Sequence, residues 1–198
     1  MDKSQAEENI QLIRDVMERS VRYTHFSGLS GVLSGVIALI GWGITWWASL
    51  NVPVDQQNAW YISIWSIVLV AAIVEDLILT HRNARRNGGS LWVPTTYQVM
   101  KAVFPGLFVA FVISLFALQT HEYHALPGFW SLGYGAALCS AGMFSVREVR
   151  IYGVIQLITG AVGLLFCRQS PYYFYQLALS FGVYQILFGL WMTRNYRR

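Results

Sequence analysis

Apolar positions along the chain group into six long runs, and the stretch that precedes the first run is polar. The runs lie roughly at 27–50, 59–80, 98–119, 126–146, 149–168 and 172–193. A helix that crosses the hydrocarbon core of a bilayer needs about 20 mostly apolar residues. The pattern therefore predicts an all-α protein, a polytopic membrane bundle of six transmembrane helices, in which only "REVR" separates the fourth span from the fifth.

The polar opening, residues 4–25, reads "SQAEENIQLIRDVMERSVRYTH" and predicts an amphipathic helix outside the membrane. Ser4 and Glu7 have the spacing of a capping box. A narrow apolar stripe starts at Ile10 and is too narrow to form a core of its own. We expect this helix to pack on a partner or on the protein's own loops, with lipid headgroups as the alternative. The chain then divides into an N-terminal helix (1–26), a six-span bundle (27–193) and a short basic tail (194–198).

Basic residues predict how the bundle is oriented. With the N-terminus inside, only Arg168 of the 14 Lys and Arg residues falls on the outer side. Cytoplasmic loops of membrane proteins carry an excess of Lys and Arg, so both termini are expected in the cytoplasm. We expect no cleaved signal peptide, because the polar opening lacks a short apolar core.

The composition agrees with a membrane location. The chain of 198 residues is 55% hydrophobic and 12% charged, with a formal net charge of +4. Soluble domains carry about 25% charged residues. Headgroup contacts and topology account for the basic loops, so we expect the lipid bilayer as a partner and no nucleic acid.

Small residues recur at four-residue spacing in the first and fourth predicted spans. They are Ser27, Gly31 and Gly35 on one face of the first span, Ser30, Ser34 and Ala38 on a neighbouring face, and Gly133, Ala137 and Ala141 in the fourth span. Small residues at this spacing let two helices approach closely. Packing within the bundle is the first interpretation, and a homodimer seam is the alternative.

The run "IRDVMERSVRYTHFSGLSGVLSGVIALIG", residues 13–41, resembles the opening of a group of uncharacterised bacterial integral membrane proteins. These proteins pair a charged helix containing "MERS" with a first span rich in Gly and Ser. The resemblance implies a bacterial inner-membrane location. It implies no activity and supplies no catalytic residue.

Two adjacent acids, Glu75 and Asp76, interrupt the second span about four to six residues before its cytoplasmic end. A charge at the bilayer centre costs about 2.5–3.5 kcal/mol on insertion scales, and less near the interface. Adjacent residues on a helix point about 100° apart, so the two carboxylates cannot face one partner equally well. We expect the shorter Asp76 to face the bundle interior and Glu75 to reach towards the interface.

Several basic or titratable side chains are expected at the same membrane level as the acids. The candidate polar pocket consists of Glu75, Asp76, Arg22, His25, His81, Arg147 and Arg150. One interpretation is a set of salt bridges that tie the second span to its neighbours. The other is a site for an ion, a proton or a cationic headgroup, which is typical of intramembrane acids in transporters. A kink at Pro105 and Gly106, at a similar depth, favours a pocket there.

The outer loop "HEYH" is a second place where chemistry could lie. His121, Glu122 and His124 carry groups that ligate transition metals, but three ligands of this kind do not close a site. We interpret the loop as a solvated polar turn and expect no metal. The sequence contains no nucleotide-binding, hydrolase-elbow or zinc-protease motif, so we expect no catalytic residue and no cofactor.

Two classes of function follow from these features. The first is a non-enzymatic scaffold or regulator of the inner membrane that engages a cytoplasmic or membrane partner through residues 4–25. The alternative is a small transporter or channel that uses Glu75 and Asp76.

Overall fold

The computed structural model describes residues 28–86, 94–167 and 173–195, with backbone only at 83–86, 94–95 and 167. The predicted N-terminal helix and the basic tail beyond residue 195 therefore lie outside the described residues. The elements are α2 (Gly28–Asn51), α3 (Val54–Arg86), α4 (Pro94–Gln119), η1 (Tyr123–Ala125), α5 (Leu126–Ala141), α6 (Arg147–Val162), η2 (Gly163–Cys167), α7 (Tyr173–Leu177), η3 (Ala178–Val183) and α8 (Tyr184–Asn195). The fold is all-α.

Five helical stretches in the described part of the chain are long and apolar enough to cross a membrane. They are α2, α3 up to residue 82, α4 from residue 96, α6 with η2, and the continuous run of α7, η3 and α8. Hydropathy thus predicts these five elements to within a few residues. The chain is a multi-pass membrane protein by the length and composition of its helices.

The fourth predicted span is shorter than the sequence pattern indicates. Helix α5 has 16 residues, which corresponds to about 24 Å at the rise of an α-helix. It ends at Ala141, where Gly142 caps it, and a turn leads to Val146 before α6 begins. The hydrocarbon core is about 30 Å thick, so α5 by itself falls short of a full crossing.

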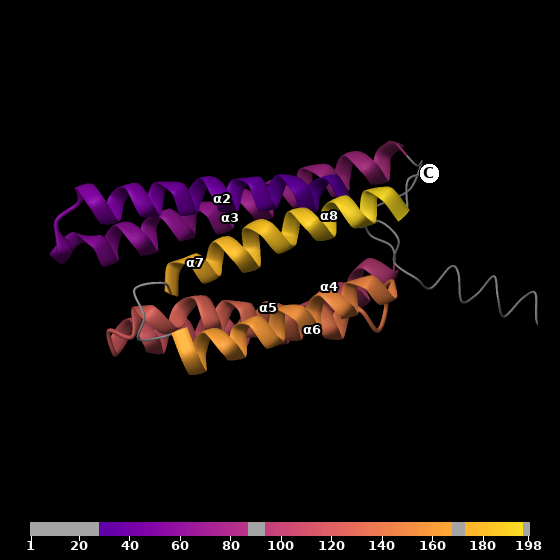
Figure 1. The fold of residues 1–198 in the computed structure, drawn as a ribbon. Helices are drawn as coiled ribbons and strands as arrows, with labels where there is room; N and C mark the ends of the chain where they lie inside the picture. Colours follow the sequence, from indigo (N-terminus) through magenta and orange to yellow (C-terminus); the bar gives the residue numbers. More distant parts are fainter. Residues whose placement is uncertain (1–27, 87–93, 168–172, 196–198) are drawn as a thin grey trace, which may run out of the picture.

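The helices form two layers (Figure 1). Helices α2, α3 and α8 lie in one layer, and α4, α5 and α6 lie in the other. Helix α7 and the π-helical turn η3 continue into α8 and contact α2 on one side. Helix α3 lies at the edge, packed along α2, and most of its surface is exposed apolar side chain suited to lipid.

Glycines bring α2 into close contact with α8 and with the η3 turn that precedes it. A Cβ atom on Gly31 would lie 3.0 Å from Cα of Gly189, and one on Gly35 would lie 2.8 Å from the carbonyl oxygen of Gly182. The face that carries Gly31 and Gly35 therefore packs within one chain. Ser27, the third member of that predicted face, lies outside the described residues.

Helix α5 uses two faces of small residues. Gly133 packs against Gly106 of α4, where a Cβ on Gly133 would lie 2.8 Å from the Gly106 carbonyl oxygen. Ala137, one turn later, flanks the same contact. On its other face, Gly135 meets Gly153 of α6 at a similar separation. Close helix contact on both sides makes α5 the centre of its layer.

Two clusters of buried apolar side chains join the layers, one towards each end of the bundle. One consists of Leu138, Val146, Val149, Tyr152, Phe188 and Met192. The other consists of Tyr61, Ala117, Leu126 and Leu177. The residues of α5, α6 and α8 that lie between these clusters are the more polar ones described below.

Candidate functional site

The seam between α2 and α3 holds both acids of the second span. The Ser30 hydroxyl donates to Oδ1 of Asp76 at 2.7 Å, and the Ser34 hydroxyl donates to Oε2 of Glu75 at 2.7 Å. Ser30 also lies 3.4 Å from Oε2 of Glu75. Ser30 and Ser34 are one helical turn apart, so their hydroxyls face the adjacent acids together. We call Ser30, Ser34, Glu75 and Asp76 the acid site.

The two acids differ in burial, and the order is the reverse of the expected one. Glu75 is half-buried and Asp76 is exposed. Ile64 and Val68, which share the face of Glu75, pack against Gly41 of α2, and this turns Glu75 into the seam. Oε1 of Glu75 is buried and has no hydrogen-bond partner among the described residues.

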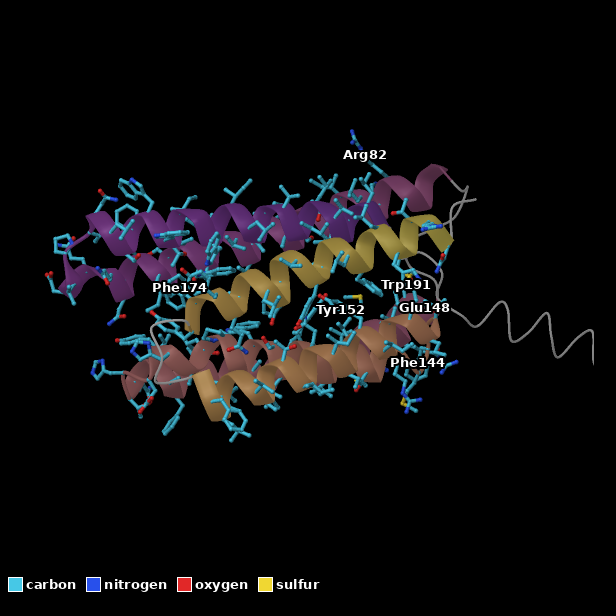
Figure 2. The ribbon with its side chains drawn as sticks, in the orientation of Figure 1. Arg82, Phe144, Glu148, Tyr152, Phe174 and Trp191 are labelled. Atoms are coloured by element: carbon cyan, nitrogen blue, oxygen red, sulfur yellow. The ribbon has the colours of Figure 1, made fainter. Side chains whose placement is uncertain are left out.

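Basic side chains do not pair with the acids in the described part of the chain. His81 and Arg82 follow on the same helix, are exposed, and Arg82 points away from the bundle (Figure 2). Arg147 and Arg150 begin α6 in the other layer and are exposed.

The remaining candidates, Arg22 and His25, lie outside the described residues. The structure thus brings the acids together with two serines. The sequence pattern had assigned those serines only to helix packing.

The side chains of the outer loop have other contacts. Nδ1 of His121 lies 3.0 Å from the Tyr123 hydroxyl, and the ring of His124 packs edge-on against Tyr173 at 4.4 Å. His121, Glu122 and His124 are all exposed. No group of three His, Cys, Asp or Glu side chains that could hold a metal ion occurs among the described residues.

A second polar group lies in the centre of the bundle, between the two apolar clusters. It consists of Ser131 and Tyr134 of α5, Tyr152 and Gln156 of α6, Ser180 of η3 and Gln185 of α8. We call these residues the central polar cluster. Ser131, Gln156 and Ser180 are fully buried, and Figure 2 shows Tyr152 between the two layers.

Hydrogen bonds connect the members of the central polar cluster. Nε2 of Gln156 donates to the Tyr152 hydroxyl at 2.7 Å and to the Ser180 carbonyl oxygen at 2.8 Å. The Tyr152 hydroxyl donates to Oε1 of Gln185, and Nε2 of Gln185 lies 3.5 Å from the Tyr134 hydroxyl. Ser131 donates to the Ser180 hydroxyl at 3.1 Å.

The backbone of η3 takes part in this network. Residues 178–183 form a π-helical turn, and the carbonyl oxygen of Ser180 within it accepts the amide of Gln156. Single π-helical turns occur frequently at functional sites, where they redirect backbone groups. Here the turn presents a carbonyl to the centre of the bundle.

The hydrogen bonds link four members of the central polar cluster in series, from Gln156 through Tyr152 and Gln185 to Tyr134.

The sequence contains a signal for the central polar cluster that the hydropathy pattern does not weigh. Gln156 is the only amide or charged side chain in residues 151–167, an otherwise apolar stretch. Polar side chains in the middle of a span face the bundle interior and hydrogen-bond across helices. An isolated glutamine in mid-span is thus informative even without a charge.

A groove of about 570 Å³ opens on the side of the bundle between α2, the end of α6, and α7 with η3. Leu39 and Trp42 form one wall, and Leu179 and Val183 of the π-helical turn form another. No charged side chain lines it. Its walls are mostly apolar and suit the hydrocarbon of a bilayer, with Thr159 and Gln176 among the lining residues.

No protein-family model, curated protein or solved structure matches this chain. The resemblance of residues 13–41 to a bacterial membrane-protein group stays a prediction. The helices are those of a multi-pass, all-α membrane bundle. Its polar contacts between helices are concentrated in the acid site and the central polar cluster.

Proposed function

We propose that the protein is a small transporter whose coupling ion, a proton or a monovalent cation, binds at the acid site. The observation that carries this proposal is the pairing of two adjacent carboxylates with two serine hydroxyls across α2 and α3. Among the described residues no basic side chain neutralises them. Oxygen ligands of this kind are those that hard cations prefer.

The electrostatics of the acid site favour an incoming positive charge. Glu75 and Asp76 are neighbours on one helix, and Oε1 of Glu75 is buried without a donor in the part of the chain that the structure describes. Two like charges close together in a membrane are costly unless a counter-charge is present. A proton or a small cation between the carboxylates removes that cost. Reversible neutralisation of an intramembrane acid is how transporters typically couple an ion to movement.

Proton flux into proteoliposomes tests the proposal. Purified protein is reconstituted with a pH-sensitive dye inside, and a potassium diffusion potential, negative inside, drives cations inward. We expect the internal pH to fall faster than in empty liposomes, and we expect Glu75→Gln with Asp76→Asn to abolish the difference. Repeating the assay with a sodium gradient and a sodium-sensitive dye distinguishes the two coupling ions.

Asp55→Asn is the matched control for the acid-site variants. Asp55 is an exposed acid on the same helix, in its first turn and far from the serines. The Asp55→Asn protein should transport ions at the wild-type rate. Wild-type flux of both ions equal to that of empty liposomes, or full flux in the double variant, would overturn the proposal.

The scaffold function is the second candidate, because the predicted N-terminal helix has an apolar stripe that needs a surface. This helix, residues 4–25, lies outside the described residues. In this proposal the protein is in a bacterial inner membrane with both termini cytoplasmic. Deletion of residues 1–22 should then abolish co-purification of a partner while the bundle keeps its melting temperature. Unchanged co-purification would exclude it.

A further inference from the structure

The groove beside α2 lies at the end of the bundle where three spans begin or end. Helix α2 ends there at Asn51, η2 ends at Cys167 and α7 begins at Tyr173 (Figure 1). All three elements belong to helical stretches that are long and apolar enough to cross a membrane. The groove therefore opens to the side of the bundle within the thickness of a bilayer, where hydrocarbon surrounds the helices.

Aromatic rings gather at this end of the groove. Trp42 and Tyr175 both line it, and their ring centroids are 5.5 Å apart. The ring of Trp46 lies 5.4 Å from that of Trp42, and Phe174 stacks on Tyr175 at 4.4 Å. Trp and Tyr rings in membrane proteins favour the level of the lipid headgroups. We call Trp42, Trp46, Phe174 and Tyr175 the aromatic end of the groove.

From the aromatic end the groove runs along α7 and η3 towards the middle of the bundle. Its lining includes Tyr175, Leu179 and Val183, which follow one another at four-residue spacing. The eight residues from Tyr175 to Val183 correspond to about 12 Å at the rise of an α-helix. One leaflet of the hydrocarbon core, half of the full thickness, is about 15 Å deep. The groove therefore covers most of the depth of one leaflet.

The walls of the groove suit an uncharged, apolar occupant. No charged side chain lines it, and its polar lining groups already have partners. Nε2 of Gln176 donates to the Thr159 carbonyl oxygen at 3.2 Å, and the Thr159 hydroxyl donates to the Ile155 carbonyl oxygen at 2.9 Å. A molecule in the groove therefore gains affinity mainly by burying hydrocarbon against Leu39, Leu179 and their neighbours.

Both π-helical turns of the described chain border this groove. Gly163 is the first residue of η2, and Leu179 and Val183 belong to η3. Single π-helical turns occur frequently at functional sites. The volume of about 570 Å³ lies within the range of about 300–1,000 Å³ that is usual for small-molecule sites.

We propose that the groove binds one acyl chain of a membrane lipid, with the ester and headgroup at the aromatic end and the chain extending towards Val183. An acyl chain fits the three features of the groove: an interfacial end, uncharged walls and a length close to one leaflet. Lipids with different headgroups can supply the chain, because no charged side chain selects among headgroups. This inference rests on the membrane-spanning helices and not on the proposed transport function.

Native mass spectrometry of the purified full-length protein measures the binding. Delipidated protein, in a steroid detergent that has no alkyl chain, is titrated with dioleoyl phosphatidylcholine. We expect one lipid to bind and saturate before further lipids add. Dihexanoyl phosphatidylcholine has the same headgroup and short chains. It should bind at least about tenfold more weakly, since each buried methylene contributes to affinity. Dioleoyl phosphatidylglycerol should bind as well as the phosphatidylcholine.

Tryptophan substitutions locate the bound chain. Val183→Trp places a large ring in the groove and should weaken lipid binding by about tenfold or more, because the ring takes the place of the chain. Leu187→Trp is the matched control. Leu187 lies four residues further along the same helical run, is 58% exposed and does not line the groove, so this variant should bind lipid as the wild type does.

Equal lipid affinity in Val183→Trp and Leu187→Trp would overturn the proposal, as would equal affinity for the long-chain and short-chain lipids. If Val183→Trp does not fold, Leu179→Trp decides, and wild-type affinity there refutes the site. A strong preference for one headgroup would overturn the acyl chain as the determinant. A wild-type dimer that Val183→Trp converts to monomers would assign the groove to a second copy of the chain and overturn the lipid as its occupant.

Discussion

The hydroxyl of Ser30 lies 2.7 Å from Oδ1 of Asp76, and this contact joins α2 to α3 near one end of the bundle. The same hydroxyl lies 3.4 Å from Oε2 of Glu75, so one serine bridges both acids. Helix α3 packs mainly along α2. The serine contacts therefore do two things at once: they hold an edge helix in place and they set the geometry of the acid site.

Removal of the serine hydroxyls should loosen α3. For Ser30→Ala with Ser34→Ala we expect a loss of about 1–2 kcal/mol in unfolding free energy, since hydrogen bonds between membrane helices are worth about 0.6 kcal/mol on average and up to about 1.7 kcal/mol. Chemical or thermal unfolding in detergent measures the change. Ser49→Ala is the control, because Ser49 is exposed and bonds to Trp46 on its own helix.

A double variant as stable as Ser49→Ala would show that the serine contacts contribute nothing to helix packing. The acid site would then be held by other means, and its geometry would have to come from the apolar contacts of α3. Gly41, which packs against Val68, would be the first residue to examine.

Alanine substitutions at two glycines of α2 distinguish the cost of overpacking from the gain in helix propensity. In Gly35→Ala the new Cβ would lie 2.8 Å from the Gly182 carbonyl oxygen and 3.0 Å from the Ile186 backbone nitrogen. Overpacking of this kind costs about 1–3 kcal/mol. A Cβ on Gly43 would meet no atom within 4 Å, so Gly43→Ala should be neutral or gain up to about 1 kcal/mol from helix propensity.

Unfolding measurements on the two alanine variants check this prediction, and light scattering of the same samples tests the homodimer alternative. Gly35 faces α8 of its own chain, so its variant should lose stability without a change in oligomeric state. A dimer that dissociates in Gly35→Ala, with an unaltered monomer, would contradict this.

Hydropathy predicts the fold well because lipid selects helices of a minimum apolar length. It predicts the ends of helices less well where a tight turn joins two of them. Helix α5 ends at Ala141 because residues Gly142 to Val146 form such a turn. The acids were predicted as a candidate site, but their partners were not. Hydroxyls at Ser30 and Ser34 serve equally as small packing residues and as donors, and one sequence does not separate these roles.

The sequence pattern predicted neither which acid enters the seam nor the central polar cluster, and the two reasons are related. Adjacent residues on a helix face different directions, and only the packing of Ile64 on Gly41 shows which acid enters the seam. Gln156 and Gln185 are single polar residues in long apolar stretches, so each changes the mean hydropathy of its span only slightly. Their contacts cross between α6 and α8, and the π-helical turn that aligns Ser180 has no sequence signature.

We expect the Tyr152 hydroxyl to contribute more to the unfolding free energy than any other single group of the central polar cluster. It accepts from Gln156 and donates to Gln185, so Tyr152→Phe removes one hydrogen bond from each of these two amides. We expect a loss of about 1–3 kcal/mol in unfolding free energy. Tyr184→Phe, at a ring packed against the same apolar cluster, should cost much less. Equal stability of the two variants would show that the amides find other partners.

A hydrophobic carbodiimide tests whether the acid site takes up protons within the membrane. The reagent partitions into the bilayer and reacts with a protonated carboxyl, whose O–H adds across one C=N bond. Acyl transfer then leaves a stable N-acylurea that mass spectrometry assigns to a residue. We expect modification at Glu75 or Asp76 and little at Asp55, which is exposed in the first turn of α3.

The modification should fall as the pH rises, since only the protonated carboxyl reacts, and it should fall with added sodium if sodium is the coupling ion. Glu75→Gln with Asp76→Asn must remove the label, which identifies the acid site as its position. No label at the acid site above that of Asp55, at any pH, would mean that the acids take up no protons. The carboxylates would then serve, with Ser30 and Ser34, only to fasten α3 to the bundle.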